Sequence, residues 1–119
     1  NNHMGSRFTR DRRASAAMAR PLRDLGFFVL DSMTPPGSVL QMEAKKLGLP
    51  TLKRDIFLDA VQTTENLLNQ LRKAERIALV AGEAIVIGHP LPETLAALGE
   101  RDSLRNAQVE YVRLAELLE

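Results

Sequence analysis

The order of structural elements is clearest in the stretch Leu25-Gly-Phe-Phe-Val-Leu-Asp-Ser32. An apolar run at 27–30 follows a Leu-Gly pair and ends in two polar residues. Glycine after an amphipathic stretch is typical of a helix C-terminus in the left-handed conformation. The stretch therefore predicts the end of a helix, a short buried strand and then a polar loop.

The same order recurs along the chain. Leu47-Gly48 precedes a run at 51–53, and Ala81-Gly82 precedes one at 84–87. Leu98-Gly99 closes a further helical pattern, and a fourth strand is expected at 109–114. Short β-branched runs that alternate with helical patterns are typical of βα units. The predicted fold class is α/β, with alternating βα units, a mostly parallel sheet and one continuous domain over residues 1–119.

The helical patterns carry their own start and stop signals. One apolar face contains Ala14, Met18, Leu22 and Leu25, and another contains Leu67, Leu71, Ala74, Ala78 and Ala81. Thr63 or Thr64 with Glu65 predicts the N-terminus of the second helix. Pro21 lies within the first pattern and is expected to kink or shorten that helix.

Composition excludes several classes of protein. Of 119 residues, 45% are hydrophobic and 26% charged, as in ordinary globular domains. Sixteen Lys and Arg nearly balance fifteen Asp and Glu, and the net charge of +1 argues against a strongly basic nucleic-acid binder. The absence of cysteine excludes disulfides and thiolate metal sites. No apolar run approaches the roughly 18 residues needed to span a bilayer.

Polar residues cluster where the predicted strands end. Asp31-Ser32 follows the first strand, Arg54-Asp55 the second with Asp59 shortly after it, and His89 the third. His3 lies in a glycine-containing loop before the first helix. Ligand sites in parallel α/β folds collect at this edge. We therefore expect the two histidines to approach one cleft, although each residue taken alone also suits a structural role.

Arginine is abundant near the start of the chain. Arg12, Arg13, Arg20 and Arg23 lie away from the Ala14-Met18-Leu22 stripe. A solvated outer helix face is the preferred interpretation, and phosphate binding is the alternative.

Several ordered motifs resemble the divergent polysaccharide deacetylases, relatives of the NodB-type carbohydrate deacetylases. The motifs are Asn1-Asn-His-Met-Gly-Ser-Arg-Phe-Thr9, Phe28-Val-Leu-Asp-Ser32, Gly48-Leu-Pro50, Lys53-Arg-Asp-Ile-Phe-Leu-Asp59, Ile85-Val-Ile-Gly-His-Pro90 and Pro92-Glu-Thr94. The resemblance implies a distorted barrel of about seven βα units, of which this chain is the C-terminal half. The family's N-terminal half, with its Asp-Asp pair and a histidine loop, is absent from the sequence.

The resemblance also implies roles for individual residues. His3 would be a metal ligand and His89 the general acid that protonates the leaving amine. Asp31 would orient His89 or line the pocket. Arg54 and Asp59 would form the pocket wall or a supporting ion pair, and Asn2 would bind substrate or metal-bound water unless it only shapes its loop. The implied cofactor is a divalent metal, usually zinc, which activates water and polarises the carbonyl.

The implied function is metal-dependent deacetylation of N-acetyl amino sugars in a polysaccharide, in the periplasm or cell envelope. The alternative is a non-catalytic relative that binds a glycan or an envelope protein. A phosphate or nucleotide binder of doubly wound type is disfavoured because no glycine-rich phosphate loop is present. The expected partners are a carbohydrate and either the missing half or a second copy of the chain, with no nucleic acid and no membrane span.

Overall fold

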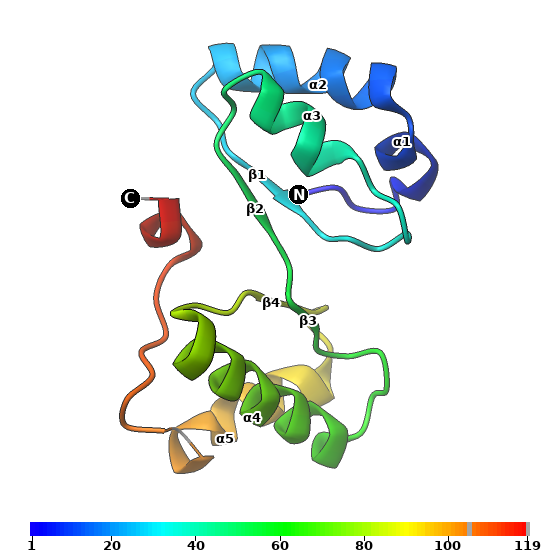
Figure 1. Cartoon of the computed structure of the whole chain (residues 1–119). Helices are drawn as coiled ribbons and strands as arrows, with labels where there is room; N and C mark the ends of the chain where they lie inside the picture. Colours follow the sequence, from blue (N-terminus) through cyan, green and yellow to red (C-terminus); the bar gives the residue numbers. More distant parts are fainter. Residues whose placement is uncertain (105, 119) are drawn as a thin grey trace. The chain divides into compact units, whose positions relative to one another are not determined.

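The computed structural model describes residues 1–104 and 106–118. The chain divides into two compact units, Asn1–Arg54 and Asp55–Leu117 (Figure 1). Each unit combines helices with one short parallel pair of strands. The predicted α/β class with parallel pairing is confirmed.

In the first unit, two parallel strands lie beside a pair of packed helices. The elements are α1 (Ser6–Arg10), α2 (Arg12–Asp24), β1 (Val29–Asp31), α3 (Leu40–Lys46) and β2 (Thr51–Lys53). Val29 pairs with Thr51 and Asp31 with Lys53. Helices α2 and α3 pack on each other. The core consists of Ala19, Val29, Leu40, Ala44 and Leu49. Val29 of β1 therefore packs with residues of α2 and α3.

The second unit repeats this construction with longer helices. Its elements are β3 (Ile56–Phe57), α4 (Thr64–Ala81), β4 (Val86–Ile87) and α5 (Pro92–Leu104), and a 3-10 helix, η1 (Leu114–Leu118), follows. Ile56 pairs with Val86 and Phe57 with Ile87 in parallel. Helices α4 and α5 pack on each other around a core of Leu58, Leu67, Leu71 and Ala97.

Local sequence signals explain most of these boundaries. Strands β2 and β4 lie within the predicted runs. Strand β1 begins within its run and extends one residue beyond it to Asp31, and β3 was not predicted. Gly26, Gly48 and Gly82 have φ values of 74°, 70° and 92°, which residues with a Cβ rarely adopt. The hydroxyl of Thr63 accepts a hydrogen bond from Asn66 N at 3.3 Å and caps α4.

The expectation of a strand at 109–114 is wrong. Residues 109–113 have no regular structure, and η1 begins at Leu114. A strand needs a partner's backbone ladder, and here a buried carboxylate provides the anchor instead. Glu75 on α4 accepts hydrogen bonds from the Tyr111 hydroxyl at 3.2 Å and from Asn106 N at 3.3 Å.

The expectation that Gly99 ends a helix is wrong, and Pro21 does not shorten its helix. Gly99 lies inside α5 and does not end it, and α2 continues past Pro21 to Asp24. Pro21 removes one hydrogen bond near the helix end, and its own carbonyl still accepts from Leu25 N at 3.1 Å. Leu22 packs against the core and holds this last turn in place.

Gly82 and Gly99, both in the second unit, should respond oppositely to alanine. Gly82→Ala should lower the free energy of unfolding by about 1 kcal/mol, because a Cβ is strained at positive φ. Gly99→Ala should raise it by about 0.5–1 kcal/mol, because alanine favours helix and, among the described residues, no heavy atom other than those of the adjoining helix lies within 4 Å of the added Cβ. Urea denaturation of both variants measures the difference, and equal effects would contradict the two backbone assignments.

Candidate functional site

Two aspartates flank the short β3–β4 ladder. The Asp55 carboxylate accepts a hydrogen bond from Ile85 N at 2.8 Å, before β4 begins. The Asp59 carboxylate accepts one from His89 N at 2.7 Å, after β4 ends. Side-chain oxygens thus replace main-chain acceptors at both ends of a ladder that is only two residues long. They fix the register of β4 and the place where its polar loop starts.

The Asp59 carboxylate also contacts the imidazole of His89. The Asp59 Oδ2–His89 Nδ1 distance is 2.9 Å. The Asp59 side chain is fully buried, whereas that of His89 is 50% exposed. A carboxylate can only accept, so this geometry assigns a proton to Nδ1 and directs Nε2 away from Asp59. The pair has a fixed end in the core and an accessible ring at the surface.

Two neighbours restrict the position of the His89 ring. The Phe57 ring meets it edge-on, with centroids 5.7 Å apart and planes at 67°. Gly88 leaves little room for a side chain, since a Cβ there would make a tight contact of 3.2 Å with Leu58 Cβ and would lie 3.6 Å from Asp59 Oδ1. The close approach at Gly88 lets Asp59 lie beneath the end of β4.

Asp31 organises the loop after β1 in the first unit. Its side chain is fully buried. One carboxylate oxygen accepts from Met33 N at 2.9 Å, and the other from Ser38 Oγ at 2.7 Å and Gln41 N at 3.3 Å. Asp31 therefore connects the strand end to the start of α3.

Asn2 and Arg54 hold the same loop from two other segments. Asn2 Oδ1 accepts from Ser32 N at 2.9 Å and from Ser32 Oγ at 2.8 Å. The Arg54 guanidinium donates to the carbonyl oxygens of Ser32 and Met33. The amide nitrogen of Asn2 is buried without a hydrogen-bond partner among the described residues. His3 follows Asn2 directly and is exposed.

The predicted site residues thus form two groups. The loop after β1 brings together Asn2, Asp31 and Arg54, and the end of β4 brings together Asp59 and His89. The sequence interpretation makes Asp31 a candidate for orienting His89, but the ring nitrogen is bound by Asp59. His3 and His89 belong to different units, so their shared cleft stays a prediction.

Sequence reasoning missed the roles of Asp55, Ser38 and Gly88. Asp55 and Asp59 each bind a backbone group thirty positions further along the chain. No local pattern encodes that offset, because the register of β3 against β4 sets it. The only available signal was the occurrence of both aspartates around an apolar triplet.

The described residues do not fit a complete zinc site. Catalytic zinc takes three protein ligands and leaves one position for water. Within residues 1–104 and 106–118, no group of three or more histidine or acidic side chains is arranged to hold a metal ion. His3 therefore supplies at most one ligand of the metal that the family resemblance implies.

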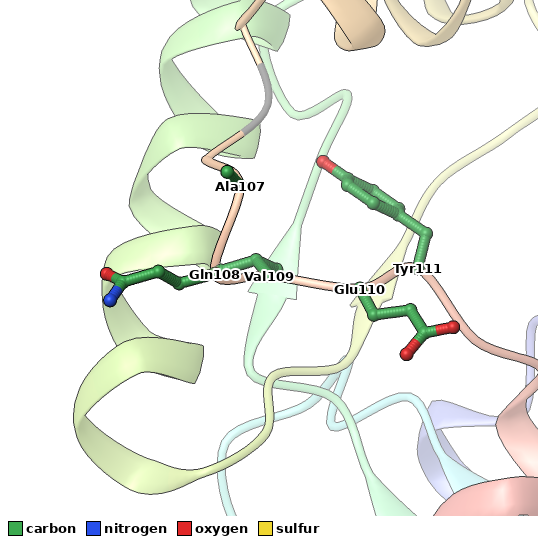
Figure 2. A pocket seen from close by; sticks show the side chains of 5 residues that line it. All are labelled: Ala107, Gln108, Val109, Glu110 and Tyr111. Carbon is green, nitrogen blue, oxygen red and sulfur yellow. The ribbon is translucent and has the colours of Figure 1, made fainter.

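One surface hollow is lined by none of the predicted site residues. It has a volume of about 400 Å³ and is lined by Ala107, Gln108, Val109, Glu110 and Tyr111 (Figure 2). These side chains come from one stretch of the chain. Among the described helices, none combines the length and the apolar character required to cross a membrane.

Comparison with known proteins places the chain in a family. Residues 1–118 match the family model described as divergent polysaccharide deacetylase. The chain is 40% identical over 106 residues to an uncharacterized protein of Haemophilus influenzae, covering 89% of the chain and 37% of that protein. It is 30% identical over 118 residues to the uncharacterized protein YibQ of Escherichia coli, covering 99% of the chain and 37% of that protein.

A solved structure agrees with the fold. The crystal structure of an uncharacterized protein from Agrobacterium tumefaciens C58 matches with a TM-score of 0.80 and 28% identity, covering 87% of this chain and 44% of that one. The chain belongs to the divergent polysaccharide deacetylase family. It spans 37% of the length of the two curated relatives.

Replacing Asp59 by asparagine should change the tautomer of His89. An amide oxygen accepts less strongly than a carboxylate, so Asp59→Asn should lower the fraction of neutral imidazole with its proton on Nδ1. Long-range ¹H–¹⁵N correlation spectra measure this fraction directly. Asp55→Asn is the matched control, because Asp55 also binds the backbone of the β4 region but does not contact the ring. An unchanged His89 tautomer in Asp59→Asn would contradict the assignment.

Proposed function

We propose that this chain carries the proton-donating part of a polysaccharide deacetylase site that acts on N-acetyl amino sugars. The observation that carries the proposal is the Asp59–His89 pair, with a fully buried carboxylate on Nδ1 and a half-exposed ring. Family membership supports the choice of substrate class.

Deacetylation of an amino sugar is the hydrolysis of an amide. The oxygen of a water molecule bonds to the acetyl carbon, and a base from outside the described residues takes a proton from that water. The carbon–nitrogen bond then breaks, acetate is released, and the sugar nitrogen leaves as an amine after it receives a proton. His89 supplies this proton from Nε2. Asp59 accepts the hydrogen bond from Nδ1 and holds the ring with Nε2 directed away from the carboxylate. A positioned general acid of this kind accelerates a reaction by roughly 10²–10⁴-fold.

The first unit would contribute the pocket wall. Arg54, Asn2 and Asp31 hold the loop at 31–33 in a defined shape, and such a loop can present main-chain groups to a sugar. In this proposal His3 is a metal ligand, and the other ligands come from outside the described residues. The metal, zinc by family resemblance, would supply Lewis-acid activation of the carbonyl and the water.

The proposed architecture is the C-terminal half of a distorted seven-unit barrel. Each sheet of the described chain has two strands, and the curated relatives are longer than this chain. We propose that further strands, from a preceding segment or from a second copy of the chain, complete the sheet. The periplasm or cell envelope, where polymers of N-acetyl amino sugars occur, is the proposed location.

Substitution of the two histidines separates their roles. His89→Ala should lower turnover by about 10²–10⁴-fold and leave metal content unchanged, because a general acid acts on the leaving group. His3→Ala should lower turnover and metal content together, because a ligand holds the ion. Acetate release from chitooligosaccharides and metal analysis give the two readouts, with Asp55→Asn as the control. Equal metal loss in both histidine variants would show that the roles are wrongly assigned.

The same assay distinguishes the alternative function. A protein that binds chitooligosaccharides but releases no acetate, with metal supplied, would be a non-catalytic glycan-binding relative. In that case His89→Ala would weaken binding rather than turnover.

The 119-residue chain alone should not behave as a self-sufficient monomer. All three residues of β1 are buried, and β1 pairs only with β2 among the described strands. A buried strand with an open edge leaves backbone groups without partners. Light scattering and thermal unfolding should show association or a broad transition, whereas a monodisperse monomer with one cooperative transition would refute the prediction.

A further inference from the structure

The two units differ strongly in charge. Residues 1–54 contain ten Lys and Arg against four Asp and Glu, which gives +6. Residues 55–119 contain six against eleven, which gives −5. The total of +1 therefore conceals a basic first unit and an acidic remainder. Such a charge asymmetry is typical of a chain in which one part binds an anionic partner.

The positive charge of the first unit is concentrated on α1 and α2. We call the exposed side chains of Arg7, Arg10, Arg12, Arg13, Arg20 and Arg23 the α1–α2 basic face. The four arginines of α2 fall within about 100° of one another on a helix with 3.6 residues per turn. Apolar Met18 and Leu22 pack against the core from the rest of the helix circumference. The basic face is therefore presented outward.

Much of this charge is not neutralised within the unit. The Arg12 Nε–Glu43 Oε1 distance is 3.9 Å, and the Arg23 Nη2–Asp24 Oδ1 distance is 2.7 Å. In the described part of the chain, by contrast, no hydrogen bond or ion pair engages Arg7, Arg13 or Arg20. Three guanidinium groups can thus bind an external anion without breaking a contact inside the protein.

Two exposed apolar residues, Met4 and Phe8, lie close to Arg7 in the sequence. Met4 is 92% exposed, and its φ of 52° holds it in an uncommon backbone conformation just before α1. Phe8 within α1 is 38% exposed and follows Arg7. An apolar side chain beside cations suits the boundary between lipid headgroups and acyl chains, where both find a favourable environment.

We propose that the α1–α2 basic face binds the surface of a membrane that contains anionic phospholipids. The arginines contact the headgroup phosphates, and Met4 and Phe8 enter the boundary with the acyl chains. Nucleic acid offers the same phosphate charge but no apolar layer for Met4, so a lipid surface accounts for both features. This binding would keep the group formed by Asn2, Asp31 and Arg54 in the first unit near the membrane surface. The proposal does not depend on the proposed hydrolysis.

The test measures binding of the full chain to vesicles of phosphatidylcholine mixed with phosphatidylglycerol, and to vesicles of phosphatidylcholine alone. Binding should require the anionic lipid and weaken as salt is raised. The combined variant Arg7→Gln, Arg13→Gln and Arg20→Gln should lose affinity about a hundredfold, since each cation near an anionic surface contributes to binding. The matched control is Arg72→Gln, Lys73→Gln and Arg76→Gln on α4, which removes the same charge from the second unit and should bind as the parent does.

Met4→Asn tests the apolar contribution. Asparagine tolerates positive φ, so the backbone is retained while the inserting group is lost. The variant should bind the mixed vesicles more weakly, with an unchanged slope of affinity against salt. Far-UV circular dichroism establishes that every variant is folded. Equal loss of affinity in the two charge variants, binding to neutral vesicles, or tighter binding to duplex DNA without dependence on Met4 would each overturn the proposal.

Discussion

The Asp59 carboxylate makes the hydrogen bonds on which the site of the second unit depends. One oxygen binds both the main-chain N–H and the ring Nδ1 of His89, at 2.7 and 2.9 Å. The end of β4 and the orientation of the imidazole are therefore set by the same buried group. The other oxygen is buried without a partner among the described residues. A buried polar atom without a hydrogen bond is destabilising. The packing around Gly88 and Leu58 must therefore offset the cost of burying this oxygen.

Both units use an aspartate to shape the loop after a strand. Asp31 binds two backbone N–H groups and one hydroxyl, so its carboxylate is engaged entirely in loop structure. Asp59 binds one backbone N–H group, and its second hydrogen bond is to the ring of His89, which is exposed at the surface. Because of this difference in partners, Asp31 has a structural role, whereas Asp59 can orient the His89 ring for chemistry. The same difference explains why His89 is the stronger candidate for chemistry than any residue of the 31–33 loop.

The proposed activity and the proposed membrane contact use different parts of the chain. The proposed proton donor, His89, lies in the acidic second unit, whereas the α1–α2 basic face lies in the first. At the proposed location in the cell envelope, a membrane contact would keep the chain close to the polymers that we propose as substrates. The two proposals stand on separate observations, the Asp59–His89 geometry and the unneutralised arginines, so either can be tested without the other.

Local sequence determined where most elements begin and end. The apolar runs at 51–53 and 84–87, the left-handed glycines at 26, 48 and 82, and the Thr63 cap follow from backbone preferences within a few residues. Motif order also indicated the family. Tertiary structure alone decided that Asp59 binds His89, because the register between β3 and β4 brings together residues thirty positions apart. It also decided that 109–114 is not a strand and that Gly99 continues a helix, since a strand needs a ladder partner and packing outweighs the weak helix preference of glycine.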